Sequence, residues 1–212
     1  MQDVIIYLGP SLPVNEAERI LMADYHPPVR RVDLPGIISE NPRIVGIIDG
    51  VFFEEAAVGH REVLAVLKAG ITVVGASSMG ALRAAELEPF GMIGIGEVFR
   101  MYRDGIIESD DEVALMCDPV TNVAFSEALV NVRITCRAAV AAGAVSQADA
   151  DVIIGTGKDL WYPDRSWQRI LRDSIPDPVR REEIARWVHE NRIDQKQADA
   201  REALEYIRKM VN

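Results

Sequence analysis

Cysteine is scarce in this 212-residue chain, which has only Cys117 and Cys136. Two cysteines are too few for a disulfide framework, and neither stands in a spacing that would hold a metal. Apolar runs are short, and none approaches the roughly 18 to 20 residues that a membrane-crossing helix needs. The first run, 4–8, is also too short for a signal peptide. These absences predict a cytoplasmic protein without disulfides, membrane spans or a metal site.

Basic residues are outnumbered, with 23 Lys and Arg against 33 Asp and Glu, and the formal net charge is −10. Such a surface repels phosphate backbones, so we expect no nucleic-acid partner. The sequence has no Gly-Lys-Ser/Thr phosphate loop, and glycines 91, 94 and 96 do not follow the Gly-x-Gly-x-x-Gly spacing. We therefore predict no nucleotide and no other cofactor.

Short apolar runs alternate with helical patterns in the first half of the chain. The apolar runs are 4–8, 44–48 and 71–74, and helical spacing follows at 17–23, 58–69 and 79–87. The proline-rich stretch 26–33 is expected to be an ordered loop. This alternation favours an α/β fold with an open parallel sheet, of the Rossmann or flavodoxin-like class, covered by helices on both faces.

The pattern changes to consecutive helices after Asp118-Pro119. Helices are predicted over 124–142, 146–160, 165–174, 178–191 and 194–211. We therefore divide the chain into an α/β core, 1–120, and a helical region, 121–212. The acidic run Asp110-Asp111-Glu112 could hold a cation or cap the segment that follows it.

Polar residues stand where the predicted strands end, and ligands of open parallel sheets bind at that edge. The strands end at Gly9-Pro10-Ser11, at Asp49-Gly50 and at Gly75-Ala76-Ser77-Ser78. Residues 76–80 have the small-x-Ser-x-small spacing of a nucleophile elbow, with alanine in place of the usual first glycine. The helix after it would offer N–H groups and partial positive charge to an anion. We predict that Ser78 or Ser77 is a nucleophile; the alternative is that both are helix N-caps.

Three further side chains are candidates for the same edge. Asp49 is predicted to be a base, an orienting group or a ligand, although an aspartate before glycine is also common in turns. His60 suits a general base, and its alternative is a solvent-facing or capping role. Arg83 would bind a carboxylate, or else pair with Glu86 or Glu54. Substrate contacts are expected from Arg83 and from Gly9, Ser11, Gly50, Gly75, Ala76 and Met79.

Several of these segments resemble the TfuA-like family, named for an accessory protein of trifolitoxin biosynthesis. The most specific segment is Gly75-Ala76-Ser77-Ser78-Met79-Gly80-Ala81-Leu82-Arg83-Ala84-Ala85-Glu86-Leu87. The resemblance extends to 9–12, 27–31, 46–52, 90–96, 102–105, 110–114, 162–167 and 194–200. One departure is Val32, which stands where the family usually has glycine, and it affects only that loop.

The resemblance implies a partner of YcaO proteins, the ATP-dependent enzymes that modify peptide backbones, in the branch that converts an amide to a thioamide. It also implies a role in supplying sulfur, by releasing sulfide from a thiocarboxylated, ubiquitin-like carrier such as ThiS. A ribosomal precursor peptide or a target protein would be a further partner. Because a thiocarboxylate is anionic, positive charge from the helix N-terminus and Arg83 would be needed before Ser78, or a water held by Asp49 or His60, attacks it.

Two other functions stay open at this point. A non-catalytic adaptor would dock on YcaO through the helical region, where Trp161, Tyr162 and Trp167 could anchor an interface. A serine hydrolase acting on small esters is less favoured, because no order of serine, histidine and acid can be assigned. The sequence does not distinguish hydrolase from adaptor, and it gives no oligomeric state.

Overall fold

The computed structural model describes residues 3–52, 56–118, 121 and 123–211, and the chain divides into two compact units. The first unit comprises Met1–Asp110 together with Lys196–Asn212, and the second comprises Asp111–Gln195. The sequence-based division near residue 120 falls outside the described residues. That division also assigned the last helix to the helical region, whereas in the structure this helix belongs to the α/β unit.

A five-stranded parallel sheet forms the centre of the first unit. Its strands are β1 (Val4–Tyr7), β2 (Asp24–His26), β3 (Ile44–Ile47), β4 (Thr72–Ala76) and β5 (Ile93–Ile95), in the order β2-β1-β3-β4-β5. The prediction of an open parallel α/β sheet is confirmed, and the strand order is that of flavodoxin-like folds. Strands β1, β3 and β4 were predicted because their residues form continuous apolar runs. The edge strands β2 and β5 have only three half-buried residues each, which gives too little pattern to recognise.

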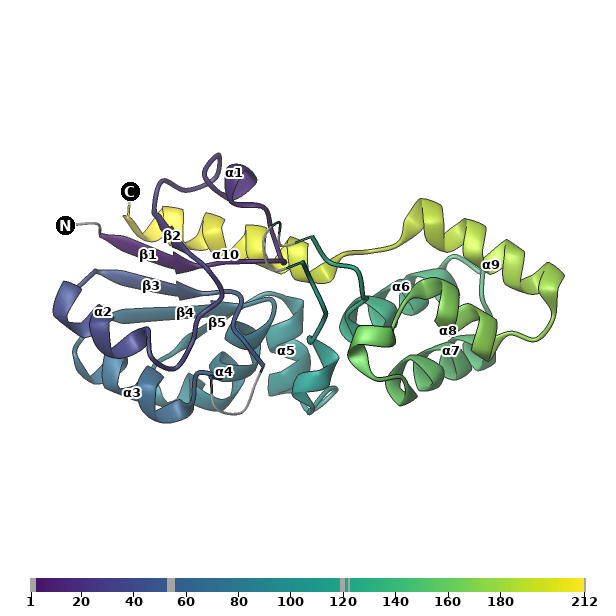
Figure 1. Cartoon of the computed structure of the whole chain (residues 1–212), viewed down its shortest axis with the longest axis horizontal. Helices are drawn as coiled ribbons and strands as arrows, with labels where there is room; N and C mark the ends of the chain where they lie inside the picture. Colours follow the sequence, from purple (N-terminus) through teal and green to yellow (C-terminus); the bar gives the residue numbers. More distant parts are fainter. Residues whose placement is uncertain (1–2, 53–55, 119–120, 122, 212) are drawn as a thin grey trace. The chain divides into compact units, whose positions relative to one another are not determined.

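Helices cover both faces of this sheet (Figure 1). Helices α1 (Val14–Ala17) and α10 (Gln195–Val211) lie on one face, and α2 (Leu34–Glu40), α3 (His60–Lys68), α4 (Met79–Leu87) and α5 (Glu97–Arg103) form the layer on the other side. The helix expected at 17–23 is wrong, because the chain becomes extended at Asp24 to pair with β1. Helix α2 was not predicted, although Pro35 stands near its start, where proline is tolerated.

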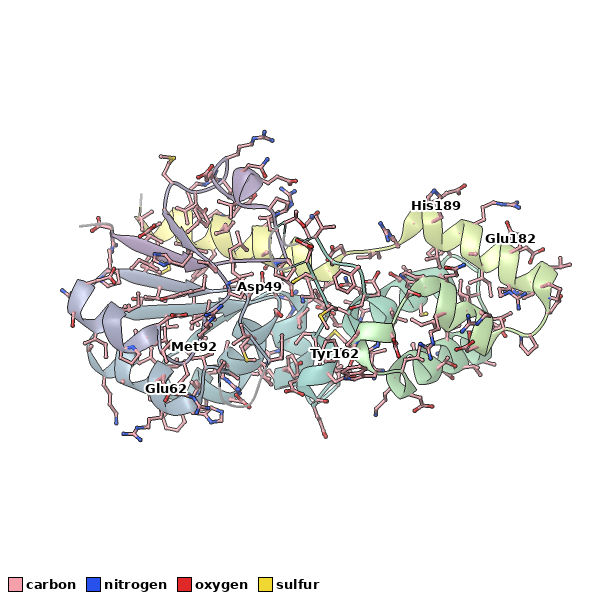
Figure 2. All side chains as sticks on the ribbon, in the orientation of Figure 1. Asp49, Glu62, Met92, Tyr162, Glu182 and His189 are labelled. Carbon is pink, nitrogen blue, oxygen red and sulfur yellow. The ribbon has the colours of Figure 1, made fainter. Side chains whose placement is uncertain are left out.

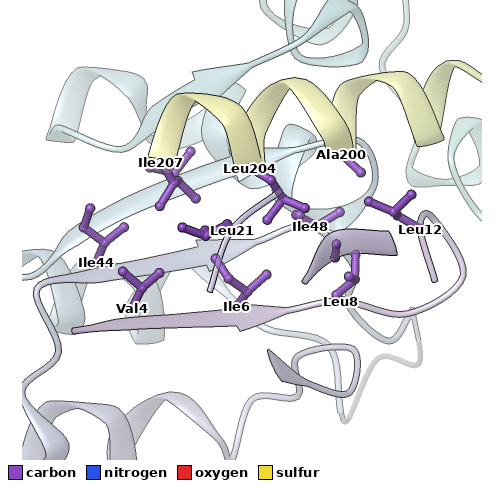
Figure 3. Packing of buried hydrophobic residues seen from close by; sticks show 12 residues of the cluster. Val4, Ile6, Leu8, Leu12, Leu21, Ile44, Ile48, Ala200, Leu204 and Ile207 are labelled. Atoms are coloured by element: carbon purple, nitrogen blue, oxygen red, sulfur yellow. The ribbon is translucent and has the colours of Figure 1, made fainter. Parts of the chain in front are cut away.

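Helix α10 supplies the core on its face of the sheet. Its Ala200, Leu204 and Ile207 are fully buried and pack over apolar residues of β1 and β3 (Figure 3). The spacing i, i+4, i+7 places these side chains in one stripe. Asp199, on the same buried side, accepts hydrogen bonds from the amides of Glu97 and Val98 at 3.0 and 2.7 Å. This carboxylate therefore caps helix α5 and fixes how α10 attaches to the sheet.

The second unit is a helical bundle with its own core. Its helices are α6 (Leu129–Ala141), α7 (Gln147–Asp159), α8 (Trp167–Ser174) and α9 (Pro178–Asn191), and all four lie within predicted segments. Ser146, Ser166 and Asp177 cap three of them by accepting backbone N–H bonds. None of the helices in the described ranges of either unit is long and apolar enough to cross a membrane.

The two cysteines of the second unit differ in burial. Neither is part of a disulfide among the described residues; Cys117 is half-buried and Cys136 is buried in α6. Burial raises the pKa of Cys136 to about 12, so at pH 8 only about one Cys136 thiol in 10⁴ is ionised. We expect iodoacetamide to alkylate Cys117 first in the native protein, and Cys136 only after unfolding in urea, as measured by peptide mass spectrometry. Equal native rates at the two positions would contradict this assignment.

Candidate functional site

The candidate site lies where the strand order reverses. Strand β1 is hydrogen-bonded to β2 on one side and to β3 on the other, so the chain leaves β1 and β3 in opposite directions. In open α/β sheets this reversal opens a crevice at the carboxyl ends of the two strands, which is where ligands bind. The loop after β1 and Asp49 after β3 meet at that edge, and Figure 2 shows Asp49 there.

Asp49 joins the two sides of the crevice. Its Oδ2 accepts the amide N–H groups of Gly9 and Ser11 at 2.9 and 3.1 Å, and its Oδ1 accepts the Ser11 hydroxyl at 2.7 Å. Asp49 is only 2% exposed, and a buried carboxylate needs such donors in place of water. Its carboxylate thus holds the loop after β1 in place and polarises one hydroxyl.

Ser77, which directly follows β4, extends this network. Its hydroxyl donates to Ser11 Oγ at 2.8 Å, which completes the chain Ser77–Ser11–Asp49. Ser77 has φ of +66°, a left-handed conformation that is uncommon for a residue other than glycine, and the Ser78 amide donates to Ala76 O across it at 2.7 Å. This is a γ-turn of the rare, strained kind, and strain of this sort is concentrated at functional sites.

Ser78 is the N-cap residue of α4 by position, but in the described structure its side chain makes no capping hydrogen bond. The first residue of α4, Met79, has an amide with no hydrogen bond among the described residues. A nine-residue helix therefore begins beside Ser77 with its positive end unoccupied by a side chain. Neither serine is used as a side-chain cap, which was the alternative to a nucleophile.

Small residues allow α4 to start this close to the strands. A Cβ added at Gly75 would lie 2.2 Å from Gly80 O, and one at Gly80 would lie 1.7 Å from Ile47 O. Gly50 is similarly covered by the buried Met79 side chain, 2.8 Å from where its Cβ would be. These contacts hold the serine turn against the ends of β3 and β4, as close helix–strand packing requires.

Substituting Gly80 by alanine is therefore expected to destabilise the first unit by about 2 to 3 kcal/mol, because backbone must move to admit the methyl group. Gly36 in α2 is the matched control, since a Cβ there meets no described atom within 4 Å. Gly36→Ala should stabilise the protein by up to about 1 kcal/mol through helix propensity. Urea unfolding followed by far-UV circular dichroism measures both. If Gly80→Ala unfolded at the same urea midpoint as the wild type, the contact between α4 and β3 would not be tight.

His60 and Arg83 lie in a separate cluster. Glu86 joins them: its Oε2 lies 2.7 Å from His60 Nε2 and 2.5 Å from Arg83 Nη1. Arg83 Nε also donates to Val58 O at 2.8 Å. The structure thus shows the ion pair with Glu86 that was the alternative for Arg83, while Glu54 lies outside the described residues. In the part of the chain described, no hydrogen bond links this cluster to Ser77 or Asp49.

Sequence reasoning identified the ends of the strands but missed how their residues connect. Ser11 was expected only as a substrate contact, and it is the link between Ser77 and Asp49. Asp199 was missed, although a charged residue at the spacing of an apolar helix face is a signal for a buried polar contact. Among the described residues no group of His, Cys, Asp and Glu side chains is arranged to hold a metal ion.

The chain matches a known protein family. The family model described as TfuA-like protein matches residues 49–166, which run from Asp49 through the serine turn and into the second unit. No curated protein matches the chain.

Proposed function

Because this chain belongs to the TfuA-like family, we propose that it releases sulfide from a thiocarboxylated, ThiS-like carrier and delivers the sulfide to a YcaO protein that forms peptide thioamides. Family membership by itself supports an accessory role beside YcaO. The hydrolytic step goes beyond that accessory role. It rests on one observation, a strained Ser77 whose hydroxyl is linked through Ser11 to the buried carboxylate of Asp49.

The hydrogen-bond chain gives Ser77 a route to lose its proton. Ser77 donates to Ser11 and Ser11 donates to Asp49, so a proton can leave Ser77 as the Ser11 proton moves to the carboxylate. Serine is a weak nucleophile until such a base acts on it. Asp49 would therefore serve as the base and Ser11 as the relay, without a histidine.

The proposed reaction has two steps, acylation of Ser77 and hydrolysis of the acyl-serine. The Ser77 oxygen attacks the carbonyl carbon of the thiocarboxylate, the carbon–sulfur bond breaks, and the serine proton leaves on sulfur as hydrosulfide. Water then attacks the acyl-serine ester, Ser77 regains a proton, and the carrier leaves as its carboxylate. The net change is thiocarboxylate plus water giving carboxylate, hydrosulfide and one proton.

The start of α4 supports the transition state of both steps. Its N-terminus carries a partial positive charge of about half an elementary charge, and the Met79 amide can donate to the developing oxyanion. A single such donor is worth about 3 kcal/mol in acyl transfer. Arg83 is already paired with Glu86, so the helix supplies the positive charge in this proposal.

The test is sulfide release from a thiocarboxylated carrier by the purified protein in the absence of YcaO. Asp49→Asn is the first variant, because asparagine can still accept the Gly9 and Ser11 amides while its own NH₂ group faces the Ser11 hydroxyl and reverses that bond. We expect the wild-type protein to release sulfide and the Asp49→Asn variant to release it at least about 100-fold more slowly. Full release by a folded Asp49→Asn protein would contradict the relay.

An adaptor that docks on YcaO without catalysis is the second candidate, and Trp161 favours it. Trp161 is 67% exposed, and its ring makes an edge-to-face contact with Tyr162, with ring centroids 5.9 Å apart. Exposed aromatic side chains are frequent anchors of protein interfaces. The same assay separates the two functions: no sulfide from wild type, together with faster thioamidation when the protein is added to YcaO and a sulfide salt, would favour the adaptor.

A further inference from the structure

A cavity lies at the same edge of the sheet, beyond β1 and β2. Its volume is about 360 Å³, and Tyr7, His26, Asp33, Ile37 and Glu40 line it. Tyr7 and His26 are the last residues of their strands, and Ile37 and Glu40 come from α2. A cavity of this size at the end of a parallel sheet is within the range of ligand sites.

Polar atoms of Tyr7 and His26 are the features of this cavity that point to a ligand. Tyr7 is 2% exposed and lines the cavity, yet among the described residues its hydroxyl makes no hydrogen bond. The hydroxyl is accessible from the cavity, where water or a ligand can bond to it, whereas the buried Nε2 of His26 in the same lining has no hydrogen-bond partner among the described residues. Burial raises the pKa of Tyr7, and the charges of Asp33, Glu40 and Asp24 raise it further, so the hydroxyl stays protonated.

The charges around the cavity favour a cation. Asp33 and Glu40 line it, and Asp24 lies 3.0 Å from His26 Nε2, in a geometry that is not a hydrogen bond. Arg30 also lines the cavity, and its amide donates to Asp33 Oδ2 at 2.7 Å. Two lining carboxylates therefore outnumber one guanidinium, and Asp24 beside His26 adds further negative charge.

The apolar part of the lining suits the stem of a long side chain. The Tyr7 ring lies beside His26, with ring centroids 5.5 Å apart, and the buried Ile37 adds an aliphatic surface. An aromatic face attracts a cation, and an arginine or lysine side chain combines an apolar stem with a charged head. The net charge of −10 also favours a basic partner.

We propose that this cavity binds an arginine or lysine side chain of a polypeptide partner. The cavity is coupled to the candidate site by the segment 27–29. Pro28 lines the cavity and packs against Gly9, where an added Cβ would lie 2.5 Å from Pro28 Cγ, and the Val29 amide donates to Asp49 O at 2.9 Å. A bound side chain would thus hold its polypeptide beside Asp49, whether or not Ser77 reacts.

The test is a titration of the ¹⁵N-labelled full chain, followed by NMR, with the blocked peptide acetyl-Gly-Arg-Gly-amide. The matched ligand control is the citrulline peptide, which has the same shape without the charge. We expect the arginine peptide to shift the amide signals of Tyr7, His26 and Ile37, and to bind at least about tenfold more tightly than the citrulline peptide. Equal affinities, or shifts confined to other residues, would overturn the proposal.

The variant Asp33→Asn/Glu40→Gln removes two carboxylates and keeps their shapes, and the new asparagine side chain would still accept the Arg30 amide. It should lower the affinity for the arginine peptide about tenfold. Glu205→Gln, an exposed position on α10, is the control and should leave the affinity unchanged. Unchanged affinity in the double variant would also overturn the proposal, and the sulfide assay, which needs no peptide, reports separately on Ser77.

Discussion

Replacing Ser77 by alanine is expected to lower sulfide release at least about 10³-fold, whereas Ser78→Ala should keep most of the activity. The reason is geometric: Ser77, not Ser78, has the left-handed φ of +66° and the hydroxyl bonded to Ser11. Ser78 contributes its backbone amide to the γ-turn, and alanine retains that amide. Initial rates of sulfide formation at equal concentrations of folded protein measure both effects.

Ser77→Gly separates the chemistry from the backbone strain. Glycine adopts positive φ without steric cost, so this variant should be more stable than Ser77→Ala by about 1 kcal/mol and equally inactive. Urea unfolding supplies the stability comparison. The opposite pattern, with Ser78→Ala inactive and both Ser77 variants active, would transfer the nucleophile to Ser78; activity in all of them would leave a water molecule as the attacking group.

The sheet was predictable because its central strands can be recognised from their own residues. Strands β1, β3 and β4 are buried along almost their whole length, so their residues are apolar without interruption. Segment 194–211 was predicted to be a helix, but its packing against the sheet was not predicted. An amphipathic pattern shows that one face of a helix is buried, but it does not show which element covers that face. Only the structure places Leu204 and Ile207 over β1 and β3.

The location of the candidate site was predictable from the sequence, but its hydrogen-bond network was not. The end of each strand could be read from Gly9, Asp49 and Gly75, and parallel strands bring their carboxyl ends to one edge. The backbone conformation that distinguishes Ser77 from its neighbour depends on how α4 packs on β3 and β4, and two adjacent serines have the same local pattern. His60 and Arg83 were associated with the edge through their place in the chain, but Glu86 holds both on the helical layer.

Replacing Arg165 by methionine is expected to cost the second unit about 2 to 4 kcal/mol of folding free energy, because the carbonyl groups bonded to the guanidinium would lose their donor. Arg165 is fully buried. Its Nε donates to Gly157 O at 2.8 Å, and its Nη2 donates to Leu160 O at 3.2 Å, so it satisfies carbonyls at the end of α7. It also pairs with Asp111 Oδ2 at 2.6 Å, which gives this residue of the acidic run a structural partner.

Methionine fills a similar volume but donates no hydrogen bond, so the carbonyls at the helix end would stay buried without partners. Arg165→Lys keeps the positive charge but lacks the planar guanidinium group, so it should lose less folding free energy than Arg165→Met. Trp161, Trp167 and Trp187 all lie in the second unit, so urea unfolding followed by tryptophan fluorescence reports on this unit alone. Arg172→Met, at a side chain 63% exposed, is the control and should leave the midpoint unchanged. If Arg165→Met unfolded at the wild-type urea concentration, the buried guanidinium would not be what holds α7 to the start of the unit.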